Sequence, residues 1–440
     1  MVSPHWCCEG PRPGAHPERS TMTITSADAA QIQKLPYSHE LDWPEGLSPW
    51  TVIDETGAQG EPYAHFEWMR RHHPVLRVSH PQEDVYFVSR YADVRKGMRA
   101  AKIYRNQVND QVPFAFPTLM DGSAHMKIRK VVAAGFTPKA IGMVADRVRD
   151  VATGLVDDFA VQGGGEVAEA LNRPLTMATI SGILGVPYKD VEQFDTWTES
   201  VWAWFARVSR MAPGLPGDEE VSQDLFDYLG SILEQLYEQD SEAVAGHIAR
   251  AWKGEGILTR QQAIELCVFV FIAGFDTTTR LMGNGYLVFK DYPELLDRID
   301  AHPRDVDKFV EELVRFRGPV HKAPRRLAEA VEVAGATIPA GSVVRLLLAS
   351  ANRDEERWGP NADKFDIDRN TEGHFGFGHG VHQCLGSPLA RLEARTMFEL
   401  IASRIDSVDF DPAHDLDLLK GNSLTNGVER LNVKVTARRR

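Results

Sequence analysis

The chain has 440 residues and a formal net charge of −13, because 49 Lys and Arg face 62 Asp and Glu. This acidic balance argues against a nucleic-acid-binding protein, which needs a basic face to neutralise phosphates. Hydrophobic residues make up 43% and charged residues 25%, which is typical of soluble globular proteins and excludes a disordered chain. The four cysteines (Cys7, Cys8, Cys267 and Cys384) are too few for a disulfide framework and indicate a reducing, cytoplasmic compartment.

The N-terminus is not expected to be a secretory signal. Residues 1–36 have several prolines in a polar run and no apolar middle, so we expect a disordered tail there, with Met22 as an alternative first residue. A single domain over residues 37–440 is expected to follow. Residues 266–275 form the most apolar stretch, and its length of about ten residues is half of what a membrane span needs. We therefore expect no membrane partner.

Short strands are predicted first, at residues 75–78 and 85–88, where β-branched and aromatic residues flank a polar turn. Residues 105–122 contain Pro113 and Pro117, which exclude a regular helix, and a loop of this length is often functional. Helical spacing dominates the middle of the chain and predicts helices at residues 125–136, 147–161, 175–184 and 223–238.

The clearest predicted helix runs from Thr259 to about Lys290, roughly 45 Å at the usual rise per residue. Thr259 and Gln262 form a capping-box pattern at its start. Residues 266–275 are apolar on every face, so this helix must cross the interior. Further elements are predicted at 305–317 (helix), 331–348 (hairpin and strand), 385–405 (helix) and 431–435 (strand). The predicted fold class is mainly α with small β-sheets, α+β in a loose sense.

Cys384 lies in a glycine-rich segment directly before the last predicted helix. Glycines at 378, 380 and 386 predict a tightly turned backbone that approaches a flat group closely. The free amides of a helix N-terminus favour a thiolate, which is either a metal ligand or a nucleophile. A buried, inert cysteine is the alternative.

Asp276 and Thr277 place polar groups inside the otherwise apolar central helix. A buried carboxylate is costly unless it is paired, and a threonine in mid-helix can bond back to the carbonyl four residues earlier. The two residues either cap a kink or deliver protons beside Ala273, a small residue that leaves room for a ligand.

Charged residues elsewhere suggest two more groups. Glu312 and Arg315 share one helix face at i, i+3 spacing and can pair, although most such pairs are weak. The candidates for a cationic cluster that binds carboxylates or phosphates are His125, Arg129, Arg325 and His382.

Together these segments resemble a cytochrome P450, a haem-thiolate monooxygenase of the soluble bacterial type, in the family's order over about residues 37–435. The most specific match is Phe-x-x-Gly-x-His-x-Cys-x-Gly, which starts at Phe377 and ends at Gly386. The resemblance implies that Cys384 is the iron ligand. It also implies haem contacts at His125, Arg129, Ala273, Arg325, Phe377, His382 and Gly386. Ala273-Gly274-x-Asp276-Thr277 is similar to the family's oxygen-activation segment, and Glu312 with Arg315 to its structural pair behind the haem.

The resemblance implies haem b as cofactor, O2 as co-substrate and electrons from NAD(P)H through a ferredoxin or flavodoxin and its reductase. One oxygen atom would enter a medium-sized organic substrate by hydroxylation, epoxidation or O-dealkylation, with Asp276 and Thr277 supplying protons. We expect the electron donor to dock near Lys127 and Lys130. The implied substrate pocket includes Phe114, Phe116, Trp202, Phe269, Val320, His321 and Thr425. His321 and Lys322 depart from the family, in which this stretch is often apolar, and one of the two is expected to meet a substrate carboxylate or phenol.

Three alternatives remain at this point. The same fold can run oxidative coupling or peroxide-driven oxidation of a secondary metabolite, or act as a haem sensor without turnover. A zinc protein is a third reading, because Cys and His side chains bind zinc and four of them lie close together in sequence: His374, His379, His382 and Cys384.

Overall fold

The computed structural model describes residues 35–50, 61–80, 83–107, 116–187, 197, 223–418 and 425–438. All elements below belong to the compact unit Leu35–Arg440. The expected tail up to residue 34 lies outside the described residues, and so do Phe114 and Trp202.

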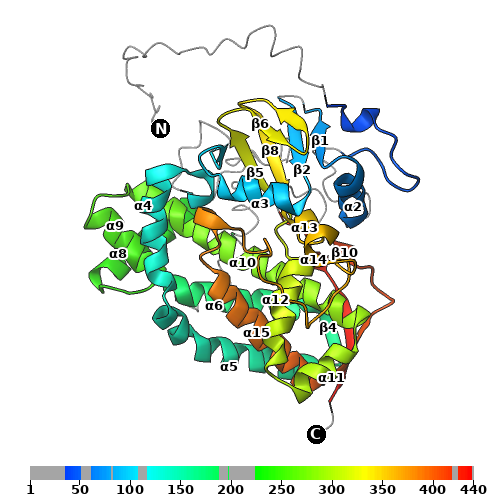
Figure 1. Ribbon diagram of the computed structural model, residues 1–440. Coiled ribbons are helices and arrows are strands. Elements are labelled where there is room, and N and C mark those ends of the chain that lie inside the picture. The colour runs from blue at the N-terminus through cyan, green and yellow to red at the C-terminus, as the bar shows by residue number, and fades with distance from the viewer. Residues whose placement is uncertain are drawn as a thin grey trace, which may run out of the picture. The chain divides into compact units, whose positions relative to one another are not determined.

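Helices make up most of the described fold, as the sequence predicts (Figure 1). The α-helices are α2 (Tyr63–His72), α3 (Tyr91–Arg99), α4 (Gly122–Ala133), α5 (Pro138–Gln162), α6 (Arg173–Leu184), α8 (Gln223–Glu238), α9 (Val244–Lys253), α10 (Arg260–Asp291), α11 (Glu294–Ala301), α12 (Asp305–Arg317), α13 (Leu348–Ala351), α14 (Glu355–Trp358) and α15 (Ser387–Arg404). Short 3-10 turns are η1 (Ser38–Glu40), η2 (Pro117–Leu119), η3 (Ala134–Phe136) and η6 (Gly380–His382), and η4 (Ala168–Asn172) is a π-helical turn.

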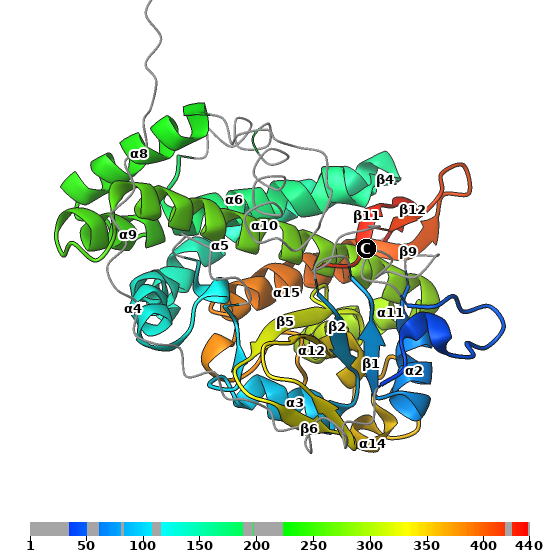
Figure 2. The same cartoon turned by 90° about the horizontal axis from the view of Figure 1, so that it is seen from above.

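The strands form small sheets. They are β1 (Val75–Val78), β2 (Val85–Val88), β3 (Tyr104–Arg105), β4 (Gly164–Glu166), β5 (Lys322–Leu327), β6 (Val331–Val333), β7 (Ala336–Ile338), β8 (Val343–Leu347), β9 (Ile405–Phe410), β10 (Asp417–Leu418), β11 (Val428–Arg430) and β12 (Asn432–Ala437). The largest sheet has the order β1-β2-β8-β5-β3, in which only β2 and β8 run parallel. It lies with α2 and α3 on one side of the bundle that contains α5, α6, α10 and α15 (Figure 2).

Helix α10 is the central element of that bundle. The Thr259 hydroxyl accepts from the Gln262 N–H (3.2 Å), and the Gln262 side chain accepts from the Thr259 N–H (3.0 Å), which confirms the predicted capping box. By length and composition α10 would be long and apolar enough to cross a membrane. However, 78% of its apolar window is buried by the rest of the protein, as in the core helix of a soluble protein.

Two apolar cores meet along α10. The first half of the helix, up to Phe275, packs with α8, α9 and the start of α15. The second half, from Leu281 onward, packs with α5, α11, α12 and the rest of α15. The residues from 276 to 280 therefore lie where one core ends and the next begins, and polar side chains there do not interrupt either core.

Candidate active site

Residues 375–386, which we call the Cys384 segment, form a tight loop that packs against α12. Gly378 and Gly380 both have φ of +70°, in the left-handed region that favours glycine. At Gly376 an added Cβ would lie 2.4 Å from Val314 Cγ1 of α12, so no side chain fits there. The Cys384 N–H donates to the Phe377 carbonyl (2.9 Å), which fixes the backbone of the cysteine.

Opposing effects act on the pKa of the Cys384 thiol. Burial raises its pKa, while the N–H groups of Gly386 and Ser387 and the charges of Arg129 and Arg391 oppose that rise. The amides before α15 alone therefore do not produce a thiolate, contrary to the simple expectation from the sequence; a coordinated metal ion would deprotonate the thiol. Cys384 is exposed in the structure, so a ligand can reach its thiol.

A second accessible surface occurs in the middle of α10. Ala273 is exposed and Thr277, one turn later, is half-buried, although Phe271, Ile272 and Phe275 are buried. The Thr277 hydroxyl donates to the Ala273 carbonyl (2.8 Å), which leaves its oxygen lone pairs available as acceptors. This short stretch of α10 can contact a ligand inside the protein.

Asp276 faces a different direction from Thr277. Its two carboxylate oxygens lie 2.9 and 3.0 Å from Arg280 Nε, one turn further along α10. Arg280 Nη1 in turn donates to Glu429 of β11 (2.8 Å). Burial opposes the charge of Arg280, but the two carboxylates more than compensate and raise its pKa. Arg280 is not among the site residues predicted from the sequence, although the spacing Asp276-x-x-x-Arg280 is a recognisable i, i+4 pair.

Histidines and arginines gather beside the Cys384 segment. The rings of His125 and His382 lie 4.0 Å apart between centroids, and His382 Nε2 is 3.8 Å from an Asp121 oxygen. Arg129 Nη2 donates to the Gln383 carbonyl (2.5 Å), next to Cys384. Within the described part of the chain, Arg129 has no carboxylate at ion-pair distance.

Arg325 approaches the same segment from β5. It is 6% exposed, it donates to the Pro324 carbonyl (2.7 Å), and its Nη2 lies 3.5 Å from Met98 Sδ. Met98 itself lies beside Gly378 and Gly380 of the Cys384 segment. Burial lowers the pKa of Arg325 to about 10, against the influence of Asp121, so the side chain stays charged at neutral pH. Among described residues no carboxylate pairs with it.

His125 is a neutral imidazole at neutral pH, not the cation that is expected from the sequence. Burial, followed by the charges of His382 and Arg129, lowers its pKa to about 4. Its Nε2 is buried and has no hydrogen-bond partner. A buried cation without a carboxylate and a buried ring nitrogen without a hydrogen-bond partner are both costly, so the cluster fits the two propionate groups of a haem.

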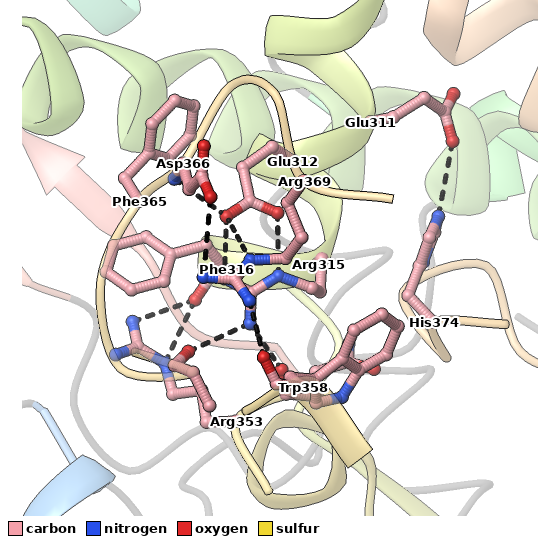
Figure 3. A network of polar contacts seen from close by, with 12 residues as sticks. Glu311, Glu312, Arg315, Phe316, Arg353, Trp358, Phe365, Asp366, Arg369 and His374 are labelled. Atoms are coloured by element: carbon pink, nitrogen blue, oxygen red, sulfur yellow. Dashed lines mark hydrogen bonds and ion pairs between the residues drawn. The ribbon is translucent and has the colours of Figure 1, made fainter. Parts of the chain in front are cut away.

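Glu312 and Arg315 form a fully buried ion pair on α12 (Figure 3), with Arg315 Nε and Nη2 at 2.6 and 2.7 Å from the carboxylate. Arg315 also donates to the carbonyls of Asn352 (2.6 Å) and Ala362 (2.9 Å). Asn352 Oδ1 accepts from the Phe375 N–H (2.7 Å) at the start of the Cys384 segment. The pair therefore joins α12 to two distant loops, and removing one partner of such a buried pair typically costs about 3–5 kcal/mol.

Five residues of the expected substrate pocket lie in the described part of the chain. Four of them form two contacting pairs, and the fifth contacts residues outside the expected pocket. Phe116 stacks on Phe269 of α10, with 5.0 Å between ring centroids. Val320 and Thr425 are joined by an isolated antiparallel β-bridge. Each pair brings together residues that are far apart in sequence.

His321 is the fifth residue, and its expected contact with a substrate is not supported. It is 2% exposed and packs between Tyr63 and Phe66, with ring centroids 5.8 and 6.2 Å away. Burial and the nearby charges of Arg353 and Arg317 lower its pKa to about 3. A neutral, enclosed imidazole has almost no surface left for a substrate to contact.

The zinc alternative is not supported either. His374 Nε2 lies 3.2 Å from Glu311, and His379 accepts a hydrogen bond from Arg99 (3.1 Å), whereas His382 lies near Asp121. These histidines have separate partners. Over the residues that the structure describes, no three His, Cys, Asp or Glu side chains are grouped to hold a metal ion.

Comparison with known proteins agrees with this geometry. The family model "Cytochrome P450" matches residues 306–417. The chain is 30% identical over 409 residues to the cytochrome P450 monooxygenase PikC of Streptomyces venezuelae, covering 89% of this chain and 96% of that protein. It is 31% identical to the vitamin D(3) 25-hydroxylase of Pseudonocardia autotrophica, covering 86% and 94%.

A solved structure shows the same fold. The structure of cytochrome P450 CYP109Q5 from Chondromyces apiculatus superposes with a TM-score of 0.76 at 29% identity, over 88% of this chain and 98% of that one. Such identity over nearly the full length of the relatives identifies the family and its reaction. This chain belongs to the cytochrome P450 family: it is a monooxygenase that carries haem b, inserts one oxygen atom of O2 into an organic substrate, and receives electrons from NAD(P)H through redox partners such as a ferredoxin and its reductase.

Proposed function

We propose that Cys384 is the iron ligand of the haem and that the propionates are bound by His125, Arg129, Arg325 and His382. The observation that carries this assignment is a buried Arg325 without a carboxylate partner and an unpartnered imidazole nitrogen of His125, together with Arg129 at the backbone next to the exposed Cys384. Haem held by a thiolate supplies the electron density that favours O–O cleavage. The residues of this chain bind it, orient it and move protons to it.

Asp276 and Thr277 are proposed to deliver those protons. Thr277 lies on the accessible stretch of α10 and offers its oxygen as an acceptor, because its hydroxyl proton is already bonded to the Ala273 carbonyl. Asp276 must leave Arg280 before it can carry a proton inward. When it does, Arg280 keeps Glu429 as a partner, so its charge is not left unpaired.

The substrate is proposed to be a medium-sized, largely apolar molecule with a few hydrogen-bonding groups, which the enzyme hydroxylates or epoxidises. Phe269, which is half-buried and stacks on the fully buried Phe116, and the small, exposed Ala273 favour such a substrate. Among the relatives are a vitamin D(3) 25-hydroxylase, a mycinamicin IV hydroxylase/epoxidase and an erythromycin C-12 hydroxylase. Their names extend from a secosteroid to macrolides and support this size class.

A spectroscopic screen tests the substrate class. Steroid- and macrolide-sized compounds are expected to shift the haem iron toward high spin in the visible spectrum, whereas one-ring aromatic compounds leave it unchanged. Phe269→Ala is expected to weaken the binding of the best compound by up to about tenfold, since it removes an aromatic contact. Val161→Ala, at an exposed position, serves as the control. Spin shifts with one-ring compounds alone would contradict the proposal.

Lys127 and Lys130 are proposed to dock the electron donor. Both are exposed on α4, the helix that carries His125 and Arg129, and neither pairs with a carboxylate in the described part of the chain. Ferredoxins and flavodoxins are usually acidic, so a basic patch on an acidic protein steers their approach. An electron donor of this kind, together with the cysteine usage, favours a cytoplasmic location.

The double variant Lys127→Glu plus Lys130→Glu is expected to slow reduction at low salt by about tenfold or more, because steering of this kind is worth about 10–10³ in rate. The spin shift with substrate should not change. Lys290→Glu plus Lys364→Glu, two exposed positions in other parts of the chain, makes the same change in net charge and controls for it. Equal reduction rates for wild type and the α4 variant would remove the docking proposal.

A further inference from the structure

Glu311 stands beside Glu312 on α12 but faces the Cys384 segment. Its Oε2 lies 3.2 Å from His374 Nε2 and 3.1 Å from Arg391 Nη2, and its Oε1 accepts from Arg391 Nε. Burial opposes ionisation of the carboxyl, but the hydrogen bonds from His374 and Arg391 outweigh it and lower the pKa of Glu311 to about 2. Glu311 is therefore an anion shared by two partners.

His374 connects Glu311 to the backbone before Cys384. The Gly376 N–H donates to His374 Nδ1 (3.1 Å), so this ring nitrogen carries no proton and the other one does. The protonated Nε2 then donates to Glu311 (Figure 3). The imidazole is thus a neutral bridge, with one nitrogen on the loop and the other on α12.

Arg391 connects Glu311 to the region after Cys384. It belongs to α15, and its guanidinium lies 4.3 Å from the centroid of the Phe377 ring. The Phe377 carbonyl accepts the Cys384 N–H, so the arginine covers the residue that holds the backbone of the cysteine. A cation over an aromatic face is a favourable contact that depends on the arginine staying in place.

We propose that Glu311 is a positioning residue for the iron-ligating sulfur of Cys384. One carboxylate ties the segment before the cysteine and the helix after it to α12, and it neutralises the arginine nearest to Phe377. This inference rests on the proposed assignment of Cys384 as the iron ligand. The network also influences the electrostatic potential at the sulfur. The negative charge of Glu311 and the positive charge of Arg391 cancel there only while both groups are present.

The reduction potential of the haem enzyme tests this role. Glu311→Gln leaves the Arg391 charge uncompensated, which favours the added electron and shifts the potential to more positive values. Arg391→Gln leaves the Glu311 charge instead and shifts the potential to more negative values. Loosening of the loop alone would move both variants in the same direction. The double variant Glu311→Gln plus Arg391→Gln removes both charges and is expected to return the potential close to that of the wild type.

A neighbouring ion pair provides the matched control. Asp307 and Arg395 join the same two helices at 3.3 Å, but they are exposed and contact no residue of the Cys384 segment. Asp307→Asn and Arg395→Gln should leave the potential unchanged, because exposed charges are screened by solvent and salt. Shifts of the same sign in the two Glu311–Arg391 single variants, or shifts no larger than in the controls, would overturn the inference.

The absorbance band of the reduced, carbon monoxide-bound enzyme distinguishes a failure of the proposed role of Glu311 from a failure of the assignment of Cys384 as the iron ligand. If the wild type lacks the band of thiolate ligation, the assignment of Cys384 fails. If the band is present and the potentials do not move as stated, the role of Glu311 fails. In each variant the band position reports whether the sulfur still binds iron, independently of turnover.

Discussion

Replacement of Cys384 by serine is expected to abolish both monooxygenase activity and the absorbance band of the reduced, carbon monoxide-bound enzyme. A serine hydroxyl is far less acidic than a thiol and offers a hard oxygen in place of a soft, electron-rich sulfur. The N–H groups of Gly386 and Ser387 and the charges of Arg129 and Arg391 only partly offset the burial of Cys384. They cannot hold an alkoxide at the same place. The loss should be complete, measured as the difference spectrum after reduction under carbon monoxide.

Cys267 supplies the control for this experiment. It is 1% exposed, lies on α10 in the apolar core, and burial raises the pKa of its thiol to about 12. Cys267→Ala should therefore keep the band, at some cost in stability, because the side chain only fills space. A Cys384→Ser variant that retains the full band would place the iron ligand elsewhere.

Asp276→Asn is expected to lower turnover by about 100-fold or more, the usual contribution of general acid–base catalysis. Asparagine still accepts a hydrogen bond from Arg280 through its amide oxygen, but it carries no transferable proton. Substrate-induced spin shifts should be unchanged, because Asp276 is buried against Arg280. Electrons from NAD(P)H should still be consumed but yield less product, so product formed per NAD(P)H oxidised is the quantity to measure.

Glu429→Gln is the companion variant. It removes the second carboxylate on Arg280 and leaves Asp276 intact, so Arg280 then has Asp276 as its remaining anionic partner in the described structure. Turnover should fall by a smaller factor than in Asp276→Asn, with product yield per electron less affected. If Asp276→Asn turns over at the wild-type rate, the proton path does not include this carboxylate.

Local signals in the sequence were sufficient for much of the fold. The strands β1 and β2 and the helices α8 and α12 have the predicted bounds, and α10 begins directly after the predicted cap Thr259. These elements have strong periodicity or clear caps, so a short stretch of sequence determines them. Helix α5 begins earlier than predicted, at Pro138, because Thr137 accepts from the Ala140 N–H and caps it.

Contacts between residues that are far apart in the sequence could not be predicted from local sequence patterns. Strand β5 occupies an inner position of the largest sheet although it carries two arginines, a lysine and a proline, which a pattern search assigns to a loop. Arg280 reaches Glu429 across 149 positions, and Arg391 reaches Glu311 across 80. Such partners are set by how helices and strands pack, and no local spacing in a single sequence reveals them.

The close approach of Gly376 to Val314 has a mechanical consequence. The space beside Gly376 is too small even for a Cβ, because Val314 occupies it. Hydrogen bonds tolerate several tenths of an ångström of stretching, whereas packed atoms resist compression steeply. The backbone before Cys384 is therefore in tight packing contact with α12, whereas the hydrogen bonds around it allow small displacements. A movement of this loop toward α12 is therefore resisted by the size of the Val314 side chain, and this resistance does not depend on pH or ionic strength.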